Sequence, residues 1–555
     1  MGLTWIDLVV FFGFFGIVVG VSLYAGRKEQ SSEDYFLAGR NLGWYLIGFS
    51  LIASNISTEH FVGMAGSAFG RIGLAIASFE WTAAITLVFV AWVLLPRFLR
   101  AGIYTMPEFL EYRYDSVTRT IMSVLVMIAY IFTLLATVLY SGAIAINAIF
   151  DLAGIFQERF NLNPEQAEFW ANTAGIWGIG IIAGAYTIYG GLKAVVWSDL
   201  LQGAALLIGG AIVTVLGFQL IGEGDIFAGI HSFYTTNAEK MHVILPWNDP
   251  DVPSLAVFFG GLWIGHLHYW GCNQFITQRT LGAKSLAEGQ RGIMFAAFLK
   301  LLIPFIVVFP GIMAYQLFGA EISAGDKAYP FLISRILPPH LRGVMFAALC
   351  GAVMSTFNSG LNSASTIFTI DIYRKFFNPN ASQRLIVTVG RLSTAFFVLI
   401  ACIWAPIISN FEGVFMYIQE FWGFIAPGIV AAFLVGLVVK TAPPKAAKGA
   451  MLIGLVLYGF SRFGRFLFDL PLLNQLPSQI QNSVAAYNGW SLLHHMGIVF
   501  VLVVVYMLIV NKRQPLSQPV TLPDAHKVDT TPEPKVYIMG GVVIAATILL
   551  YILFW

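Results

Sequence analysis

Residues 44–70 read WYLIGFSLIASNISTEHFVGMAGSAFG, an apolar stretch that carries the polar cluster SNISTEH at positions 54–60. The stretch is long enough to cross a bilayer, which takes about 20 apolar residues. A polar, poorly helical segment at mid-membrane depth is tolerated only where protein covers it or where it lines a water-filled cavity. We therefore predict that this span is a broken helix whose break is sheltered by other helices.

A second interruption follows five spans later. Residues 260–274 read GGLWIGHLHYWGCNQ, in which Gly265 and Gly271 flank His266 and His268. Two interrupted helices at matching positions of successive five-span units are typical of an inverted-repeat transporter. Small residues also serve ordinary helix packing in any bundle, so the polar cluster at 54–60 carries more of this argument than the glycines do.

The whole chain has the composition of a polytopic membrane protein. Of its 555 residues, 58% are hydrophobic and 11% are charged, against about 45–50% and 25% in soluble domains. The net charge of +2 gives no electrostatic case for a nucleic-acid partner, and three cysteines without CxxC spacing indicate neither a disulfide framework nor a zinc site. We predict an all-α membrane protein with fourteen transmembrane helices, near residues 6–25, 44–70, 72–95, 120–149, 168–188, 194–220, 254–273, 290–318, 341–371, 387–409, 414–438, 447–467, 490–510 and 536–555.

Charge predicts how these spans are oriented. The first span carries Asp7, has no preceding Lys or Arg and lacks a cleavage site, so it is not a cleavable signal. With the N-terminus outside, most of the 31 Lys and Arg residues, among them Arg279, Lys284 and Arg291, fall in the odd-numbered loops. The positive-inside rule places such loops in the cytoplasm. We predict a multi-pass protein of the cell (inner or plasma) membrane with both termini extracytoplasmic.

The spans and linkers predict the following organisation. An extra N-terminal helix and cytoplasmic loop (1–43) precede a first five-helix repeat (44–220) and a second, inverted one (254–440). Peripheral helices (441–510), a cytoplasmic linker (511–535) and a C-terminal helix (536–555) follow. The linker is rich in Pro and Thr, which predicts a disordered or extended chain.

Ionisable side chains inside spans need a reason, because each costs about 2.5–3.5 kcal/mol at the bilayer centre. The candidates are Glu59, His60, Glu80, Asp199, His266, His268, Lys300 and Glu420. Lys300 and Glu80 either form a buried structural pair or both reach a polar ligand, Lys300 as donor and Glu80 as acceptor.

The second interrupted span has a polar and aromatic face. His266, Tyr269, Trp270 and Asn273 are spaced i, i+3, i+4 and i+7. Such a face suits a neutral polyhydroxy ligand, although Tyr and Trp near a membrane interface are also ordinary packing residues. His266 and His268 lie about 200° apart around a regular helix, so they do not chelate one metal ion.

Residues 351–369, GAVMSTFNSGLNSASTIFT, place Ser355, Thr356 and Ser359 on adjacent helical turns. Neutral oxygens of this kind hold Na⁺, often together with carbonyls freed by a broken helix. Hydroxyls in spans also commonly bond back to their own backbone.

Six segments of the chain are distinctive: SLIASNISTEHFVGMAGSA, IASFEWTAAITL, AYTIYGGLKAVVWSDLLQG, YWGCNQFITQRTLGAKS, FAALCGAVMSTFNS and FMYIQEFWGFIAPG. Together they resemble the sodium/solute symporter family, and above all its sodium/sugar (glucose/galactose) branch. The resemblance runs from residue 3 to about 440. It implies fourteen helices, a ten-helix inverted-repeat core of the leucine-transporter type, and alternating access with Na⁺ as coupling ion and no other cofactor.

The resemblance also implies site residues. The sugar site would comprise Asn55, His60, Glu80, His266, Tyr269, Trp270, Lys300 and Gln419, with His266 replacing an Asn of the bacterial relatives. Tyr269 would form the inner gate, and Met64, Phe79 and Phe415 the outer one. Sodium would be held by carbonyls of Ala53, Ile56 and Ala352 and hydroxyls of Ser355 and Thr356. Asp199 and Ser359 would serve cation release or a second cation, although Asn358 stands where a second site would need a hydroxyl.

These observations predict sodium-driven symport of a monosaccharide, glucose or galactose, with Na⁺, the sugar and the lipid bilayer as partners. No feature of the sequence indicates an oligomeric state. One alternative is a symporter of the same fold for inositol, an amino acid or sialic acid. Lys300 could pair an anionic solute, whereas Glu80 with Gln419 argues against one. Another alternative is a sugar-gated sensor, in which an acid would be expected at Gln419. An enzyme is disfavoured because the spans show no nucleophile–base or metal-ligand spacing.

Overall fold

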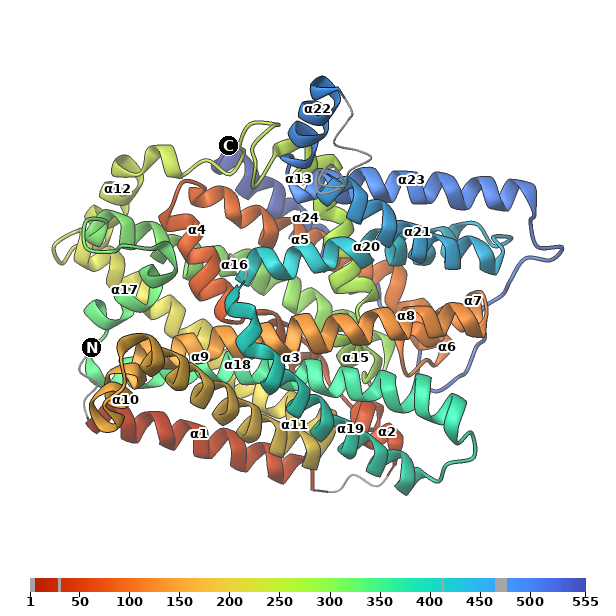
Figure 1. The fold of residues 1–555 in the computed structure, drawn as a ribbon, viewed down its shortest axis with the longest axis horizontal. Coiled ribbons are helices and arrows are strands. Elements are labelled where there is room, and N and C mark those ends of the chain that lie inside the picture. Colours follow the sequence, from red (N-terminus) through yellow and green to blue (C-terminus); the bar gives the residue numbers. More distant parts are fainter. Residues whose placement is uncertain (1–4, 28–30, 411–413, 465–476) are drawn as a thin grey trace.

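The computed structural model describes residues 5–27, 31–410, 414–464 and 477–555, and these are helical with only isolated β-bridges between loops. In Figure 1, α1 (Trp5–Ala25) lies along one face, and α21 (Pro444–Phe463) and α23 (Leu492–Arg513) lie along the opposite one. Between them run α8 (Ser116–Ala129), α9 (Ala136–Phe150) and α18 (Pro339–Thr366). Ten of the described helical segments are long and apolar enough to cross a membrane. The predicted all-α membrane fold is therefore confirmed, while the count of fourteen spans stays a prediction.

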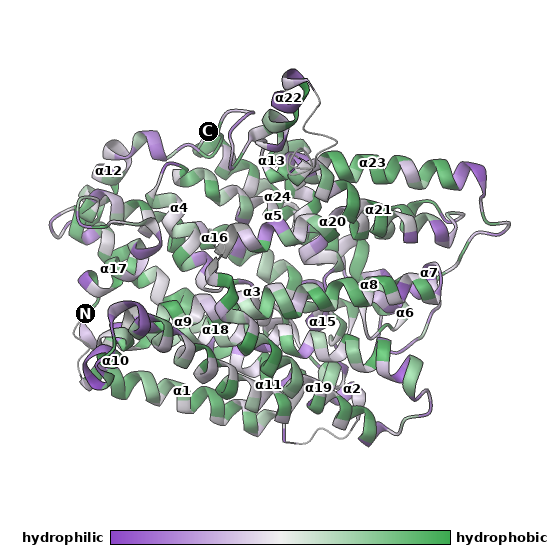
Figure 2. Ribbon diagram, viewed as in Figure 1, coloured by the Kyte–Doolittle hydropathy of each residue, from purple (hydrophilic) through white to green (hydrophobic). Residues whose placement is uncertain are grey.

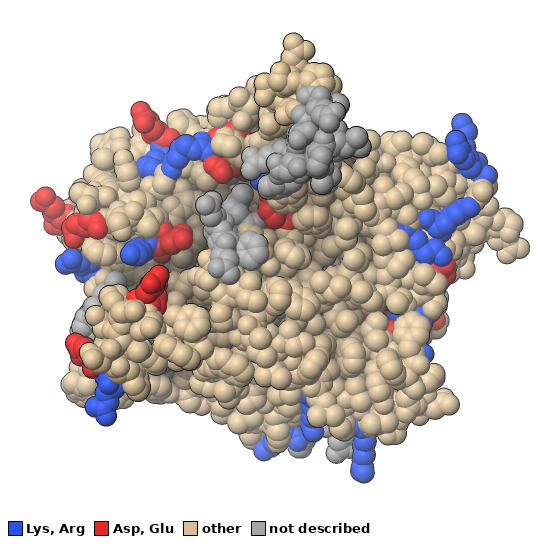
Figure 3. All heavy atoms as spheres, viewed as in Figure 1, with Lys and Arg blue, Asp and Glu red and all other residues tan. Residues whose placement is uncertain are grey.

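Apolar side chains cover the surface between the two ends of the bundle. Hydrophobic residues dominate the helices and hydrophilic residues gather in the loops (Figure 2). The visible face is uncharged over a broad area, and Lys and Arg predominate at the end where α21 begins and α23 finishes (Figure 3). This distribution suits a molecule whose middle lies in hydrocarbon and whose ends meet water.

The first predicted broken span is broken in the structure. Helix α3 (Trp44–Asn55) ends one residue before Ile56, whose backbone is extended with φ −76° and ψ 107°. A π-helical turn at Glu59–Met64 and the short helix α4 (Ala65–Phe69) complete the span. The last carbonyls of α3 therefore have no following helical turn whose N–H groups could donate hydrogen bonds to them.

The second broken span is interrupted at two residues. Gly260 (φ −127°, ψ −141°) separates α13 (Ser254–Phe259) from α14 (Gly261–His266), which leads into a π-helical turn at Leu267–Cys272. The second break comes at Asn273 (φ −90°, ψ 120°), beyond Gly265 and Gly271, and the Asn273 side chain caps α15 (Gln274–Leu281) by accepting from the N–H of Phe275. Asn273 also accepts from the Tyr130 hydroxyl, so it acts as a helix cap and does not continue the predicted face.

One helix contains two predicted spans. Helix α11 runs over Pro164–Ile221 and is interrupted at Gly191, whose φ of 49° and ψ of −149° require glycine. The other long helices are α1 (Trp5–Ala25), α5 (Ser78–Phe89), α8 (Ser116–Ala129), α9 (Ala136–Phe150), α16 (Leu286–Phe318), α18 (Pro339–Thr366), α19 (Gln383–Trp404), α20 (Val414–Val438), α21 (Pro444–Phe463), α23 (Leu492–Arg513) and α24 (Pro534–Leu553). Shorter helices are α2 (Ser32–Leu37), α6 (Leu95–Ala101), α7 (Met106–Arg113), α10 (Leu152–Phe160), α12 (Ile226–Thr236), α17 (Ala328–Ile336) and α22 (Ser478–Asn488).

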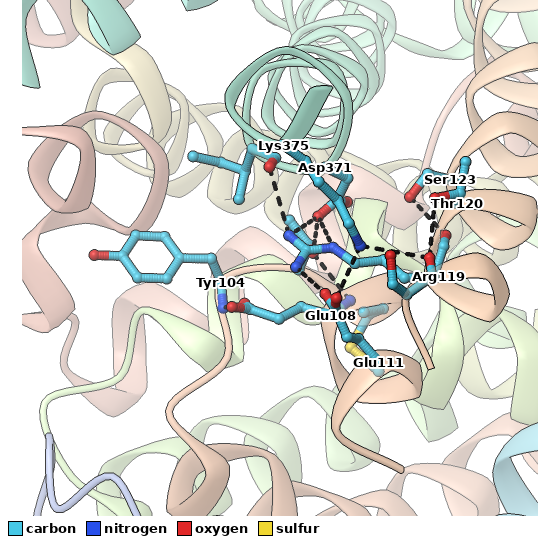
Figure 4. A network of polar contacts seen from close by, with 12 residues as sticks. Tyr104, Glu108, Glu111, Arg119, Thr120, Ser123, Asp371 and Lys375 are labelled. Atoms are coloured by element: carbon cyan, nitrogen blue, oxygen red, sulfur yellow. Dashed lines mark hydrogen bonds and ion pairs between the residues drawn. The ribbon is translucent and has the colours of Figure 1, made fainter. Parts of the chain in front are cut away.

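A network of ion pairs joins the start of α8 to the π-helical segment Ile367–Phe377 that follows α18 (Figure 4). Arg119 Nε donates to Asp371 Oδ1 at 2.8 Å, and its Nη1 donates to Glu111 at 2.5 Å. Lys375 also reaches Glu111, at 2.8 Å, and the Thr105 hydroxyl donates to Asp371. Asp371 is fully buried, so its charge depends on these partners.

The linker before the last helix is extended. Its backbone N–H groups at Leu516, Val520 and Ala525 donate to carbonyls of Thr441, Lys440 and Arg100. Of the two predicted states the described residues therefore adopt the extended one. The helix behind it, α24, packs against α5 and α16 and buries Val536, Gly540, Val543, Thr547 and Tyr551.

Candidate functional site

A cavity of about 120 Å³ lies between the two broken spans. Its lining comes from the α3 break, α5, the π-helical segment Tyr130–Leu135, α14 and the turn after it, α16, α18, α20 and α23. All eight residues predicted to bind substrate line it: Asn55, His60, Glu80, His266, Tyr269, Trp270, Lys300 and Gln419. Residues up to 364 positions apart in the sequence (55 to 419) thus meet at one cavity, while their role in binding stays a prediction.

An ion pair stands at the centre of this lining. Lys300 Nζ donates to Glu80 Oε2 at 2.6 Å and also to Asn55 Oδ1. Both charged side chains are almost fully buried, at 1% and 3% exposure. Lys300 also lies 5.1 Å from the ring centroid of Trp270, within range of a cation–π contact. The sequence left open whether these residues form a buried structural pair or reach a polar ligand. The structure is compatible with both, because the pair is formed and both members line the cavity.

Two further contacts link the pair to the broken helices. His60 Nε2 lies 3.3 Å from Glu80 Oε1. Asn55 Nδ2 donates to the Tyr269 hydroxyl at 3.2 Å. Because Asn55 ends α3 and Tyr269 lies in the π-helical turn after α14, this bond joins the two interrupted spans where the inner gate was predicted.

Both histidines of the second broken span line the cavity, although a regular helix would separate them. His266 Nε2 lies 2.8 Å from the Thr82 hydroxyl, and His268 stacks obliquely near Trp422 with centroids 5.2 Å apart. The π-helical turn over 267–272 widens the helix and changes its angular spacing. The prediction assumed the angular spacing of a regular α-helix and therefore did not place both histidines at one cavity.

The predicted outer gate is described in part. Met64 and Phe79 line the cavity. The Phe415 side chain lies outside the described residues.

One wall comes from a helix that the sequence placed at the periphery. Leu493 and Met496 of α23 line the cavity. The approach is close because α14 presents glycines to α23: a Cβ at Gly261 would lie 1.9 Å from the Leu493 carbonyl oxygen. Nothing in the composition of residues 490–510 distinguishes these two apolar residues from lipid-facing ones.

The predicted sodium ligands lie where α3 ends against α18. Ala53, Ile56 and Ala352 are buried, and the Thr356 hydroxyl donates to the Ser54 carbonyl at 3.1 Å. The Ser355 hydroxyl donates to Asp199 Oδ1 at 2.5 Å. Backbone carbonyls and hydroxyls are neutral oxygens of the kind that holds Na⁺, and the Asp199 carboxylate contacts one of these hydroxyls. Their role as sodium ligands stays a prediction.

Asp199 belongs to a buried network that includes an arginine the sequence analysis placed in a loop. Ser50 and Ser54 donate to Asp199 Oδ2 at 2.5 and 3.3 Å. Arg279 Nη2 lies 3.7 Å from Asp199 Oδ2, and its Nε donates to Ser50 at 2.8 Å. The assignment of Arg279 to a loop is therefore wrong: α15 carries it into the core, where it is fully buried.

The same arginine contacts the residue predicted for a second cation. Arg279 donates to the Ser359 hydroxyl, which also lies 3.0 Å from the Ser54 hydroxyl. A guanidinium in contact with Ser359 repels a cation there. The role of Ser359 in cation release or at a second cation site stays a prediction.

Glu420, a partly buried acid in a predicted span, is absent from the described cavity lining. It accepts from Arg462 Nε at 2.6 Å and from the Tyr458 hydroxyl at 3.0 Å. These contacts join α20 to α21, so Glu420 has a structural partner on the side away from its neighbour Gln419.

A membrane-spanning helical fold with two interrupted helices around a polar and aromatic cavity defines a secondary transporter. The sequence profile of the Sodium:solute symporter family matches residues 35–456. The chain belongs to the sodium:solute symporter family.

Named relatives agree with this assignment. A Sodium/glucose cotransporter of Vibrio parahaemolyticus is 41% identical over 500 residues, covering 86% of this chain and 88% of the relative. A Sodium/myo-inositol cotransporter 2 of Sus scrofa is 33% identical over 504 residues, covering 84% and 71%. A solved substrate-bound, outward-open Na⁺-coupled sialic acid symporter superposes with a TM-score of 0.75 at 20% identity, covering 94% and 99%.

The family consists of sodium-coupled transporters. The predictions of Na⁺ as coupling ion, of a multi-pass membrane location and of a transporter in place of an enzyme are thereby confirmed. The superposition with the sialic acid symporter extends the agreement to the fold.

Proposed function

We propose that this chain carries a neutral monosaccharide, glucose or galactose, into the cell together with Na⁺. The observation that carries the proposal is the Glu80–Lys300 pair on the cavity wall. A pre-formed pair offers a sugar hydroxyl both a charged donor and a charged acceptor, and such hydrogen bonds contribute more than neutral ones.

The charge of the cavity argues against an anionic solute. Among the described lining residues Lys300 is the only lysine or arginine, and Glu80 already neutralises it. Glu59 adds a second carboxyl group to the lining. A carboxylate-bearing solute such as sialic acid or an amino acid would meet no unpaired cation among these residues, which costs free energy in a buried site.

The cavity lining suits a single sugar ring. The cavity volume of about 120 Å³ is well above the roughly 10–15 Å³ that a single water needs, so it has room for a small solute. Trp270 and Trp422 supply aromatic faces, and Gln419 and Asn55 supply amides.

Coupling would follow from the position of Thr356. This residue lines the cavity and also bonds to the end of α3, where sodium is predicted to bind. Na⁺ bound to α3 and α18 would order the break that presents Asn55 and His60. Each ligand then favours the other by the same factor, and loss of Na⁺ to a low-sodium cytoplasm releases both.

A second candidate is myo-inositol. It has the same hydroxyl chemistry as a hexose, and a myo-inositol cotransporter shares 33% identity with this chain. Gln419 on the cavity wall supports a transporter over a sugar-gated sensor.

The test is uptake into proteoliposomes with an inward Na⁺ gradient and a matched K⁺ control. Labelled glucose, galactose, myo-inositol and sialic acid are compared in one preparation. Sodium-dependent accumulation of glucose or galactose above equilibrium supports the proposal. Accumulation of myo-inositol alone would contradict the proposal and support the second candidate function. Accumulation of sialic acid alone would contradict the argument from the charge of the cavity.

Gln419→Ala supplies the matched site variant. We expect uptake to fall about 10-fold, because a buried hydrogen bond to the solute is lost. Phe421→Ala, two residues along the same helix and outside the described cavity lining, is the control for effects on folding. Equal rates in both variants would remove Gln419 from the site.

A further inference from the structure

Trp81 forms a second cross-link directly behind the Glu80–Lys300 pair. It follows Glu80 on α5, and its indole Nε1 donates to the carbonyl of Leu301, which follows Lys300 on α16, at 3.3 Å. Trp81 is fully buried and is absent from the described cavity lining. Helices α5 and α16 are therefore joined by two adjacent contacts, the ion pair and the hydrogen bond from the indole.

The last helix covers this tryptophan. Tyr551 at the end of α24 meets the Trp81 ring edge-on with centroids 5.8 Å apart, and Phe554 lies at the same distance. Phe554 also packs against Phe305 of α16. The α24 end is itself fixed, because the Val243 N–H donates to the Phe554 carbonyl at 2.8 Å.

We propose that Trp81, held by the last turn of α24, is a positioning residue that sets the register of Glu80 against Lys300. This inference rests on the proposed function, since it concerns the affinity for the solute. The indole bond fixes the level of α5 against α16, and Tyr551 and Phe554 prevent the ring from leaving its rotamer. A pair kept in one geometry before the solute arrives binds it more tightly than a pair that must be ordered on binding.

The chain provides an internal control at the other end of α24. Trp92 Nε1 donates to the Val536 carbonyl at 3.4 Å, and its ring lies 5.6 Å from that of Tyr537. Trp92 therefore anchors the same helix by the same chemistry. It contacts the start of α24. Trp92 itself lies about three helical turns after Glu80 in the sequence, away from the ion pair.

The experiment compares Trp81→Phe and Trp92→Phe in the full-length protein. Phenylalanine keeps an aromatic ring and removes the N–H donor. For Trp81→Phe we expect the KM for labelled glucose or galactose to rise about 2- to 12-fold, with Vmax and the sodium concentration for half-maximal uptake unchanged. Trp92→Phe is expected to leave all three unchanged, and Phe554→Leu is expected to act like Trp81→Phe.

Backbone hydrogen exchange gives a readout that needs no solute. We expect Trp81→Phe to increase exchange in residues 78–84 and 297–303, and Trp92→Phe to leave both segments as in the wild type. An unchanged KM with unchanged exchange in Trp81→Phe overturns the inference, as do equal effects of the two tryptophan variants. If the wild-type protein takes up neither sugar, the proposed function fails, and exchange alone then decides whether Trp81 fixes the pair.

Discussion

Replacing Glu80 with glutamine tests the ion pair at the centre of the cavity. The Glu80 carboxylate accepts from Lys300 at 2.6 Å and lies 3.3 Å from His60 Nε2. Glutamine keeps the shape of the side chain but has one acceptor oxygen, so its NH₂ group must face one of the two neighbours. The Lys300 ammonium then loses its charged partner and retains the neutral amide oxygen of Asn55.

Two free energies change in this variant. Removing one partner of a buried ion pair costs about 3–5 kcal/mol of stability, and the remaining Asn55 acceptor places the cost near the lower figure. A hydrogen bond between a charged group and a solute hydroxyl contributes about 1.5–3 kcal/mol. Since about 1.4 kcal/mol is a factor of ten in affinity, the KM for the sugar is expected to rise about 10- to 150-fold.

The two effects are separated by two measurements. Initial rates of sodium-driven uptake give the KM, and thermal unfolding in detergent gives the change in stability. Lys300→Met and the double variant complete a double-mutant cycle, in which members of one unit lose less together than the sum of their separate losses. A folded Glu80→Gln protein whose KM stays within about threefold of wild type would refute a solute contact, and additive losses would refute the pair as a unit.

Two further predictions concern sodium and pH. Thr356→Ala should raise the sodium concentration for half-maximal uptake about 10-fold because an oxygen ligand is lost, while Thr356→Ser restores it; an unaltered sodium dependence removes this residue from the ion site. Burial raises the pKa of Asp249, but hydrogen bonds from Arg71 and backbone N–H groups, with the Arg71 charge, outweigh it and hold the pKa below its usual range. This stabilisation is present above the unfolded pKa of about 3.9 and is lost as pH falls through the lower folded value. Melting curves between about pH 5 and pH 2 should therefore show a smaller loss of Tm in Asp249→Asn than in wild type, and identical profiles would contradict this.

The broken spans and the charged pair were predictable because they violate a strong rule. Apolar stretches 20 or more residues long with polar clusters inside are costly in hydrocarbon, so Asn55, Glu80 and Lys300 stand out without any tertiary information. The structure places all three on one cavity wall. The same rule identified Glu420 but could not tell that Arg462, 42 residues later, neutralises it.

Residues whose position depends on local geometry or packing escaped prediction. His268 reaches the cavity because a π-helical turn changes the angular spacing that a regular helix would give. Asn273 caps α15 because a break falls there and not at Gly265 or Gly271. The sequence around Arg279 predicts a loop position, and Arg279 is a core residue only because α15 places it beside Ser50.

The glycine contact between α14 and α23 couples the positions of these two helices. No side chain cushions the contact, since a Cβ at Gly261 would meet the Leu493 carbonyl oxygen at 1.9 Å. A rotation of α14 during transport must carry α23 with it or open a gap in the cavity wall. The outer face of α23, where Val501, Leu502 and Val505 are exposed, is therefore a surface at which binding is expected to affect the transport cycle. A ligand that binds this face is therefore expected to slow transport without entering the cavity.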